Sequence, residues 1–158
     1  MNAIDIEVED PRWTEALPEV EALAYAAAQA ALDEVEFEGG VALLLTDDAA
    51  VHDLNKRFRD QDKPTNVLSF PSRLNPEAHL GDVALAFGVC AAEAQAQGKP
   101  LAHHLQHLVA HGVLHLVGYD HETDAEAAEM EDLERVVLAE LGVPDPYAAE
   151  RGDDGQFR

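Results

Sequence analysis

The sequence predicts a small α/β domain of the α+β type, in which helices cover a mixed sheet of about four strands and a three-histidine metal site lies at one end. Three observations support this prediction. Short apolar runs of strand length alternate with longer segments that have helical periodicity, glycines and prolines separate these segments, and 158 residues suffice for one buried core. We expect residues 1–143 to form a single catalytic metal-binding domain and residues 144–158 to be a disordered polar tail.

The first half of the chain alternates strands with helices. Residues 4–8 alternate apolar and polar side chains, as a half-buried strand does. The alanine-rich stretch at 15–36 has the apolar spacing of a helix. The continuously apolar run at 41–46 predicts a second strand, and an aspartate after it caps a helix that reaches about residue 58.

The second half continues the same alternation. The predicted segments are a loop at 59–65, strands at 67–70 and 82–87 joined by a loop at 71–80, and helices at 89–97, 100–118 and 123–141. Gly98 and Gly118 favour helix ends. Thr123 and Glu126 have the spacing of a capping box, which predicts where the last helix begins.

The charge balance is strongly acidic. Ten Lys and Arg residues against 32 Asp and Glu residues give a formal net charge of −22, which normally argues against a polyanionic partner. Half of the basic residues nevertheless lie in one short interval: Lys56, Arg57, Arg59, Lys63 and Arg73. We therefore expect a local basic patch on an acidic protein.

Cysteine content and hydropathy indicate the compartment. Cys90 is the single cysteine, so neither an internal disulfide nor a CxxC site is possible. The N-terminus lacks the features of a signal peptide, and the most apolar run, 41–45, is far too short to span a membrane. We expect a cytoplasmic protein without a membrane partner.

The histidine-rich segment contains the most informative pattern. His111 and His115 are four residues apart, so a helix presents both on one face. Gly118 allows the chain to leave the helix, and the turn can return His121 to the same point. Imidazole nitrogens suit zinc, and three protein ligands leave a fourth position open, as in catalytic sites. We predict one zinc ion per chain.

The other histidines are assigned no ligand role. His107 and His104 lie close to the same helix face and could compete for the ion, but we assign His107 to a supporting or packing role. His52, His79 and His103 are interpreted as ordinary surface or core residues.

The three histidines and Gly118 have the offsets of the metzincin protease motif H-E-x-x-H-x-x-G-x-x-H. Gly112 stands where that motif has its general-base glutamate, so the usual base for peptide hydrolysis is absent. Gly112 falls on the apolar side of the predicted helix, which favours close helix packing there.

A second set of residues supplies groups suited to a phosphate. Arg59 offers a planar fork of permanently charged donors, fitted to a phosphate or a developing oxyanion. The candidate substrate-binding residues around it are Lys56, Arg57, Lys63, Thr65, Asn66 and Ser69. A turn followed by a strand is the structural alternative for Thr65, Asn66 and Ser69.

These residues together resemble the bacterial YbeY family. The resemblance is carried by the arginine segment at 55–59, by Lys-Pro-Thr-Asn-Val-Leu-Ser-Phe-Pro at 63–71, by Leu-Gly-Asp-Val at 80–83, by the histidine block at 107–121 and by the helix at 130–134. It implies a zinc-dependent, single-strand-specific endoribonuclease of ribosomal RNA maturation, notably at the 3′ end of the small-subunit RNA, and of ribosome quality control. It implies His111, His115 and His121 as zinc ligands and catalytic residues, with Arg59 as the functional arginine. The small ribosomal subunit or its proteins are the implied partners.

Two other functions stay open at this point. The first is a metzincin-like metalloprotease, which the histidine offsets alone support. The second is a non-enzymatic ribosome assembly factor whose fold zinc stabilises, with Asp120 as a fourth ligand that could close the site. The sequence does not fix the oligomeric state, the cleavage site or the nucleophile, which could be a water or the 2′-hydroxyl of the RNA.

Overall fold

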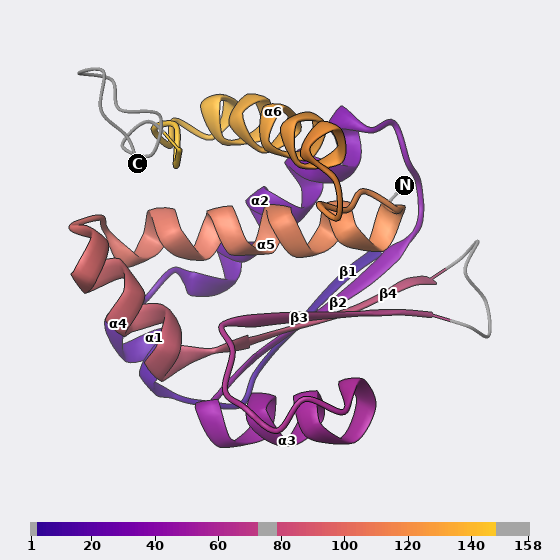
Figure 1. Cartoon of the computed structure of the whole chain (residues 1–158). Coiled ribbons are helices and arrows are strands. Elements are labelled where there is room, and N and C mark those ends of the chain that lie inside the picture. The colour runs from indigo at the N-terminus through magenta and orange to yellow at the C-terminus, as the bar shows by residue number, and fades with distance from the viewer. Residues whose placement is uncertain (1–2, 73–78, 148–158) are drawn as a thin grey trace.

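The computed structural model describes residues 3–72 and 79–147 (Figure 1). In chain order the elements are β1 (Ala3–Val8), α1 (Arg12–Ala16), α2 (Val20–Glu34), β2 (Gly40–Thr46), α3 (Asp48–Arg59), β3 (Val67–Pro71), β4 (His79–Ala86), α4 (Phe87–Gln97), α5 (Leu101–Val117) and α6 (Asp124–Glu140). The predicted mixed α/β fold with a four-stranded sheet is confirmed.

The sheet has the strand order β1-β2-β4-β3. β1, β2 and β4 run parallel, whereas β3 is antiparallel to β4. The register places Ile6 beside Leu43 and Leu43 beside Val83. β3 is therefore an edge strand, and it is the strand that carries Ser69 next to the histidine helix.

The main core lies between one face of the sheet and the helices α2, α5 and α6 (Figure 1). Strand side chains alternate, so Ile6, Leu43 and Val83 point to this face and pack under α2 and α5. α5 is buried along most of its length. Its position against β3 and β4 is consequently fixed by packing on both sides, which makes it a rigid base for its histidines.

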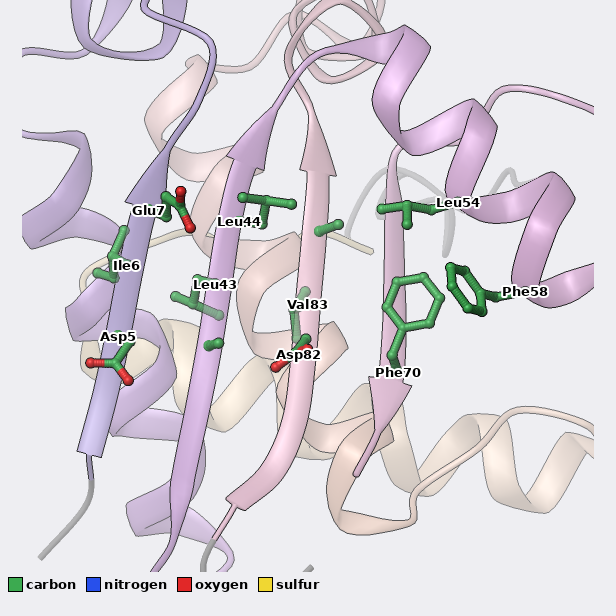
Figure 2. Close-up of a pocket in the computed structure, with 12 residues that line it drawn as sticks. Asp5, Ile6, Glu7, Leu43, Leu44, Leu54, Phe58, Phe70, Asp82 and Val83 are labelled. Carbon is green, nitrogen blue, oxygen red and sulfur yellow. The ribbon is translucent and has the colours of Figure 1, made fainter. Parts of the chain in front are cut away.

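The opposite face of the sheet is only partly covered, by α3. Figure 2 shows this face, where Leu44, Leu54 and Phe70 line a groove of about 770 Å³. Asp5, Glu7 and Asp82 also line it. The groove contains no histidine among its lining residues, so it is separate from the histidine cluster.

Three predicted boundaries were wrong. The single helix expected at 15–36 is two helices, because the residue before Pro18, Leu17, takes an extended conformation that interrupts the helix. The strand expected at 82–87 begins at His79 and ends at Ala86, since the pairing of His79 with Gly40 of β2 extends it into the predicted 71–80 loop. Phe87 accordingly begins α4, two residues before the expected start.

Local capping signals behave as predicted. The side chain of Asp47, and not of Asp48, caps α3 by accepting a hydrogen bond of 2.7 Å from the Ala50 amide. Thr123 caps α6 by accepting one of 3.1 Å from the Glu126 amide. The two helices therefore begin where their polar residues satisfy otherwise unpaired backbone donors.

The remaining sequence predictions concern the ends and the surface. Of the predicted tail at 144–158, residues 144–147 are described and Tyr147 packs against His107. Residues 148–158 lie outside the described residues, as does Arg73 of the expected basic patch. Cys90 is buried. None of the helices in the described part of the chain is long and apolar enough to cross a membrane.

Candidate metal centre and nucleic-acid site

Three histidines converge at the C-terminal end of α5. His111 and His115 lie one turn apart on that helix, and His121 comes from the loop that follows it. One ring nitrogen from each residue lies within 4.8 Å of the others. The centres of the His111 and His115 rings are 4.8 Å apart, and those of His115 and His121 are 5.1 Å apart. The predicted trio is thus brought together at one point.

The chain returns to this point because of Gly118. Gly118 follows the last turn of α5 with a φ of 121°, a conformation that side-chain-bearing residues rarely adopt. Its amide still donates to the Leu114 carbonyl, at 3.2 Å, which closes the helix. The Asp120 carboxylate then accepts a 2.7 Å hydrogen bond from the His121 amide and holds the turn.

The donor set fits a metal ion. Nδ1 of His111 lies 2.7 Å from a carboxylate oxygen of Glu134. A ring that donates through Nδ1 directs its Nε2 lone pair outward, which is how most metal-bound histidines are held. Burial lowers the pKa of His115, and the neighbouring His111 and His121 lower it further. His115 is therefore kept in the neutral form that binds metals.

Glu134 was missed by the sequence analysis as a functional residue. It belongs to α6 and is 1% exposed. Its burial opposes ionisation, but hydrogen bonds with His107 and His111 outweigh this effect and lower its pKa to about 2. A signal was available, because a glutamate four residues after Met130 and three before Val137 lies on the apolar face of the helix.

Arg59 shares a cavity with the histidines. It ends α3 and lines a cavity of about 520 Å³ together with His111, His115 and His121. Nη2 of Arg59 donates to the Ser69 carbonyl, and the guanidinium carbon lies 5.9 Å from the centre of the Phe70 ring. These contacts hold the guanidinium against β3. One of its five N–H groups is used in the bond to Ser69.

The three polar residues before and in β3 also line this cavity: Thr65, Asn66 and Ser69. The side-chain amide of Asn66 donates to the Glu93 carboxylate at 3.0 Å, and the Ser69 hydroxyl donates to the Gly112 carbonyl at 3.0 Å. Ser69 is also buried. Both side chains therefore have structural partners, and their assignment as substrate contacts stays a prediction.

The three lysine and arginine neighbours of Arg59 lie outside the cavity lining. Lys56 lies 4.0 Å from Asp62, and Arg57 lies 3.2 Å from Asp53. Lys63 accepts a hydrogen bond from Asn55 through its backbone carbonyl. Their role in RNA binding is a prediction for the approach to the site and not for the cavity itself.

The other histidines lie outside the metal cluster. His52 and His79 are near Asp62 and Asp82, at 2.8 and 2.9 Å. His104 is buried, and its Nε2 lies 2.8 Å from a carboxylate oxygen of Glu93. His103 is half-buried. His107 contacts Glu134, as described below. Among the described residues, the metal cluster is limited to the predicted trio.

Gly112 is explained by packing. A Cβ atom at this position would lie 2.7 Å from Cγ1 of Val83 and 3.2 Å from the Ser69 hydroxyl. Val83 is fully buried, so a larger residue requires β4 or α5 to move. The place of the metzincin glutamate is therefore filled by the strand beneath the helix, in agreement with the packing interpretation.

The chain is similar to known proteins over most of its length. The family model for endoribonuclease YbeY matches residues 5–142. An endoribonuclease YbeY of Paramagnetospirillum magneticum is 52% identical over 155 residues, covering 91% of this chain and 94% of that protein. One of Azorhizobium caulinodans is 53% identical over 153 residues, covering 92% of this chain and 96% of that protein.

A solved structure has a similar fold. The solution structure of a Thermotoga maritima protein is similar with a TM-score of 0.56 and 25% identity, covering 99% of both chains. The family-model match runs over residues 5–142, a range that contains Arg59 and the three clustered histidines. The chain belongs to the YbeY endoribonuclease family.

Proposed function

We propose that this protein is a zinc-dependent endoribonuclease that cuts single-stranded RNA in the cytoplasm. Its substrate is ribosomal RNA, with the 3′ end of the small-subunit RNA as the site of maturation and the small ribosomal subunit or its proteins as partners. The relatives that match most of the chain carry the name endoribonuclease. The metal and the ribosomal substrate follow from the family resemblance and the histidine site.

The cavity shared by the metal cluster and Arg59 is the main support for this function. The three histidines and Arg59 line the same surface cavity, with the metal cluster on α5 and its loop and the guanidinium at the end of α3. A metal centre that shares a cavity with a permanently charged planar donor is an arrangement suited to phosphoryl groups. Both elements are packed on the same sheet, so their separation is fixed by the fold.

The roles follow from the chemistry of each side chain. His111, His115 and His121 would hold the ion, and zinc when bound supplies a Lewis acid for a phosphoryl oxygen or a water. Arg59, steadied by the Ser69 carbonyl and the Phe70 ring, binds a non-bridging phosphate oxygen and stabilises the charge that develops as the bond breaks.

The size of the cavity supports a flexible strand as substrate. At about 520 Å³ it has the dimensions of a small-ligand site. A cavity of this size can hold one nucleotide whose base is unstacked, which single-stranded RNA supplies more readily than a duplex. Single-stranded loops and ends are thus the expected substrates.

Neither alternative function is supported. Proteolysis of the metzincin type needs a general base beside the first histidine, and the contact between position 112 and Val83 leaves no room for one. A non-enzymatic assembly factor does not account for a charged arginine that shares the metal cavity, and the matched relatives carry an enzyme name.

Cleavage assays with purified protein test the proposal. The zinc-loaded chain is expected to cut a single-stranded RNA, to lose activity when a chelator removes the metal, and to regain it when zinc is restored. A perfect RNA duplex of the same sequence should resist cleavage. His79→Ala is the matched control, because His79 lies outside both the metal cluster and the cavity. Cleavage that persists in the metal-free protein would refute the proposal.

A further inference from the structure

Tyr147 reaches back to the metal site from the segment after α6. Its hydroxyl donates to Oε1 of Glu134, and the same hydroxyl lies 3.2 Å from Nε2 of His107. The other carboxylate oxygen of Glu134, Oε2, lies 2.7 Å from Nδ1 of His111. A continuous set of contacts therefore joins Tyr147, through one carboxylate, to a histidine of the metal cluster.

The proton positions in this set are determined by the carboxylate. An ionised carboxylate only accepts hydrogen bonds, so each partner of Glu134 must donate to it. Tyr147 donates its O–H, His107 donates from Nε2 at 2.8 Å, and His111 donates from Nδ1. With its proton on Nδ1, His111 has its lone pair on Nε2, as a metal ligand requires.

Further contacts fix Tyr147 itself. Its ring packs edge-on against His107, with the ring centres 5.4 Å apart, and lies 5.4 Å from the guanidinium carbon of Arg135. The Tyr147 amide donates to Asp145 at 2.8 Å, and Arg135 pairs with Asp145 at 3.3 Å. The hydroxyl is therefore held next to Glu134 by a packed ring.

Tyr147 lies beyond the matched family region, which ends at residue 142. We propose that Tyr147 is a positioning residue for the metal centre. It holds Glu134 so that Oε2 keeps the His111 ring in its metal-binding orientation. His107 also donates to this carboxylate, from α5, and this hydrogen bond is the supporting role that the sequence predicted for it. The inference rests on the proposed zinc site.

The expected effects differ among variants. Glu134→Gln removes the charge that orients His111, and changes of this kind typically weaken metal binding about 10- to 100-fold. Tyr147→Phe keeps the ring and its packing but removes one hydrogen bond to the carboxylate. A loss of zinc affinity of about two- to tenfold is expected from one net hydrogen bond. Tyr25→Phe is the matched control, since Tyr25 is 44% exposed on α2.

The test measures zinc affinity without RNA, by competition with a chromophoric chelator. The visible absorption spectrum of the cobalt-substituted chain and the rise in melting temperature on zinc addition are recorded for the same proteins. Tyr147→Phe should weaken zinc binding, alter the cobalt spectrum and reduce the zinc-dependent rise, whereas Tyr25→Phe should match the wild type. A purely structural role would lower the metal-free and zinc-loaded melting temperatures equally.

The outcomes separate this inference from the proposed function. A Tyr147→Phe protein with wild-type zinc affinity and an unchanged cobalt spectrum overturns the inference and leaves the proposed function standing. A wild-type chain that binds no zinc overturns both. If Glu134→Gln fails to fold, Tyr147→Phe decides the question alone, because its ring packing is retained.

Discussion

The contact between α5 and β4 at Gly112 predicts a coupling that can be measured. In Gly112→Ala, the new Cβ would lie 2.7 Å from Cγ1 and 3.2 Å from Cγ2 of Val83. Favourable carbon contacts are about 3.5–4.0 Å, so the helix and strand must separate or Val83 must leave its rotamer. Val83 is fully buried and β-branched, which leaves it little freedom.

The magnitude follows from two opposing contributions. Overpacking a buried site costs about 1–3 kcal/mol, whereas alanine in place of glycine within a helix stabilises by about 1 kcal/mol. The net destabilisation of Gly112→Ala is therefore about 0–2 kcal/mol. Because this range approaches zero, the informative quantity is the coupling with Val83→Ala, which removes Cγ1 and Cγ2 of Val83 and leaves only the 3.2 Å contact with the Ser69 hydroxyl.

Urea denaturation of the four metal-free proteins gives this coupling: wild type, each single variant and the double variant. Val83→Ala should cost less in the Gly112→Ala background than in the wild type, by about 1–2 kcal/mol, within the range seen for residues in contact. Removing the metal first prevents binding free energy from entering the comparison. Additive effects, within about 0.5 kcal/mol, would refute the packing explanation of Gly112.

Arg59→Lys should cleave RNA nearly as poorly as Arg59→Ala, because lysine lacks the planar fork of donors, while zinc content and melting temperature stay normal. Near-wild-type activity of the lysine variant would show that Arg59 contributes only its positive charge. Burial lowers the pKa of His104 in the folded protein, although the hydrogen bond with Glu93 opposes this effect. As the pH falls, His104 is therefore protonated in the unfolded chain at a higher pH than in the folded chain, which favours unfolding. The metal-free protein should therefore lose stability below about pH 6.5, by at most about 1.4 kcal/mol per pH unit for this histidine, and urea denaturation should show a shallower slope in His104→Gln. The net charge of −22 predicts that the RNA association rate is low at 0.01 M salt, where the Debye length is about 30 Å, rises toward 0.1 M, where it is about 10 Å, and then falls. A steep decline from the lowest salt in stopped-flow measurements would show that the acidic surface faces away from the RNA.

The sequence predicted the parts of the site that depend on local spacing. Two histidines four apart on a helix, a glycine that ends it and a third histidine define one point in space with little help from the rest of the fold. Likewise, the alternation of apolar and polar residues at 4–8 predicted the half-buried strand β1, whose Ile4, Ile6 and Val8 pack against the core. The Gly112 packing also followed from its place on the apolar side of the helix.

Contacts between distant segments could not be predicted in this way. Glu134 meets His111 across 23 residues because α6 packs on α5, and Tyr147 meets His107 across 40 residues. Spacing along the chain does not encode such pairings. The start of β4 depended similarly on a distant segment, since His79 joins the sheet by pairing with Gly40 of β2.

Zinc content and RNA cleavage, measured together in His111→Ala, His115→Ala and His121→Ala, test the central claim most directly. Two imidazoles hold an ion much more weakly than three, so each variant should lose both its zinc and its cleavage of single-stranded RNA, while His79→Ala keeps both. Full zinc occupancy in His121→Ala, or cleavage by any of the three zinc-depleted variants at the wild-type rate, would contradict the account.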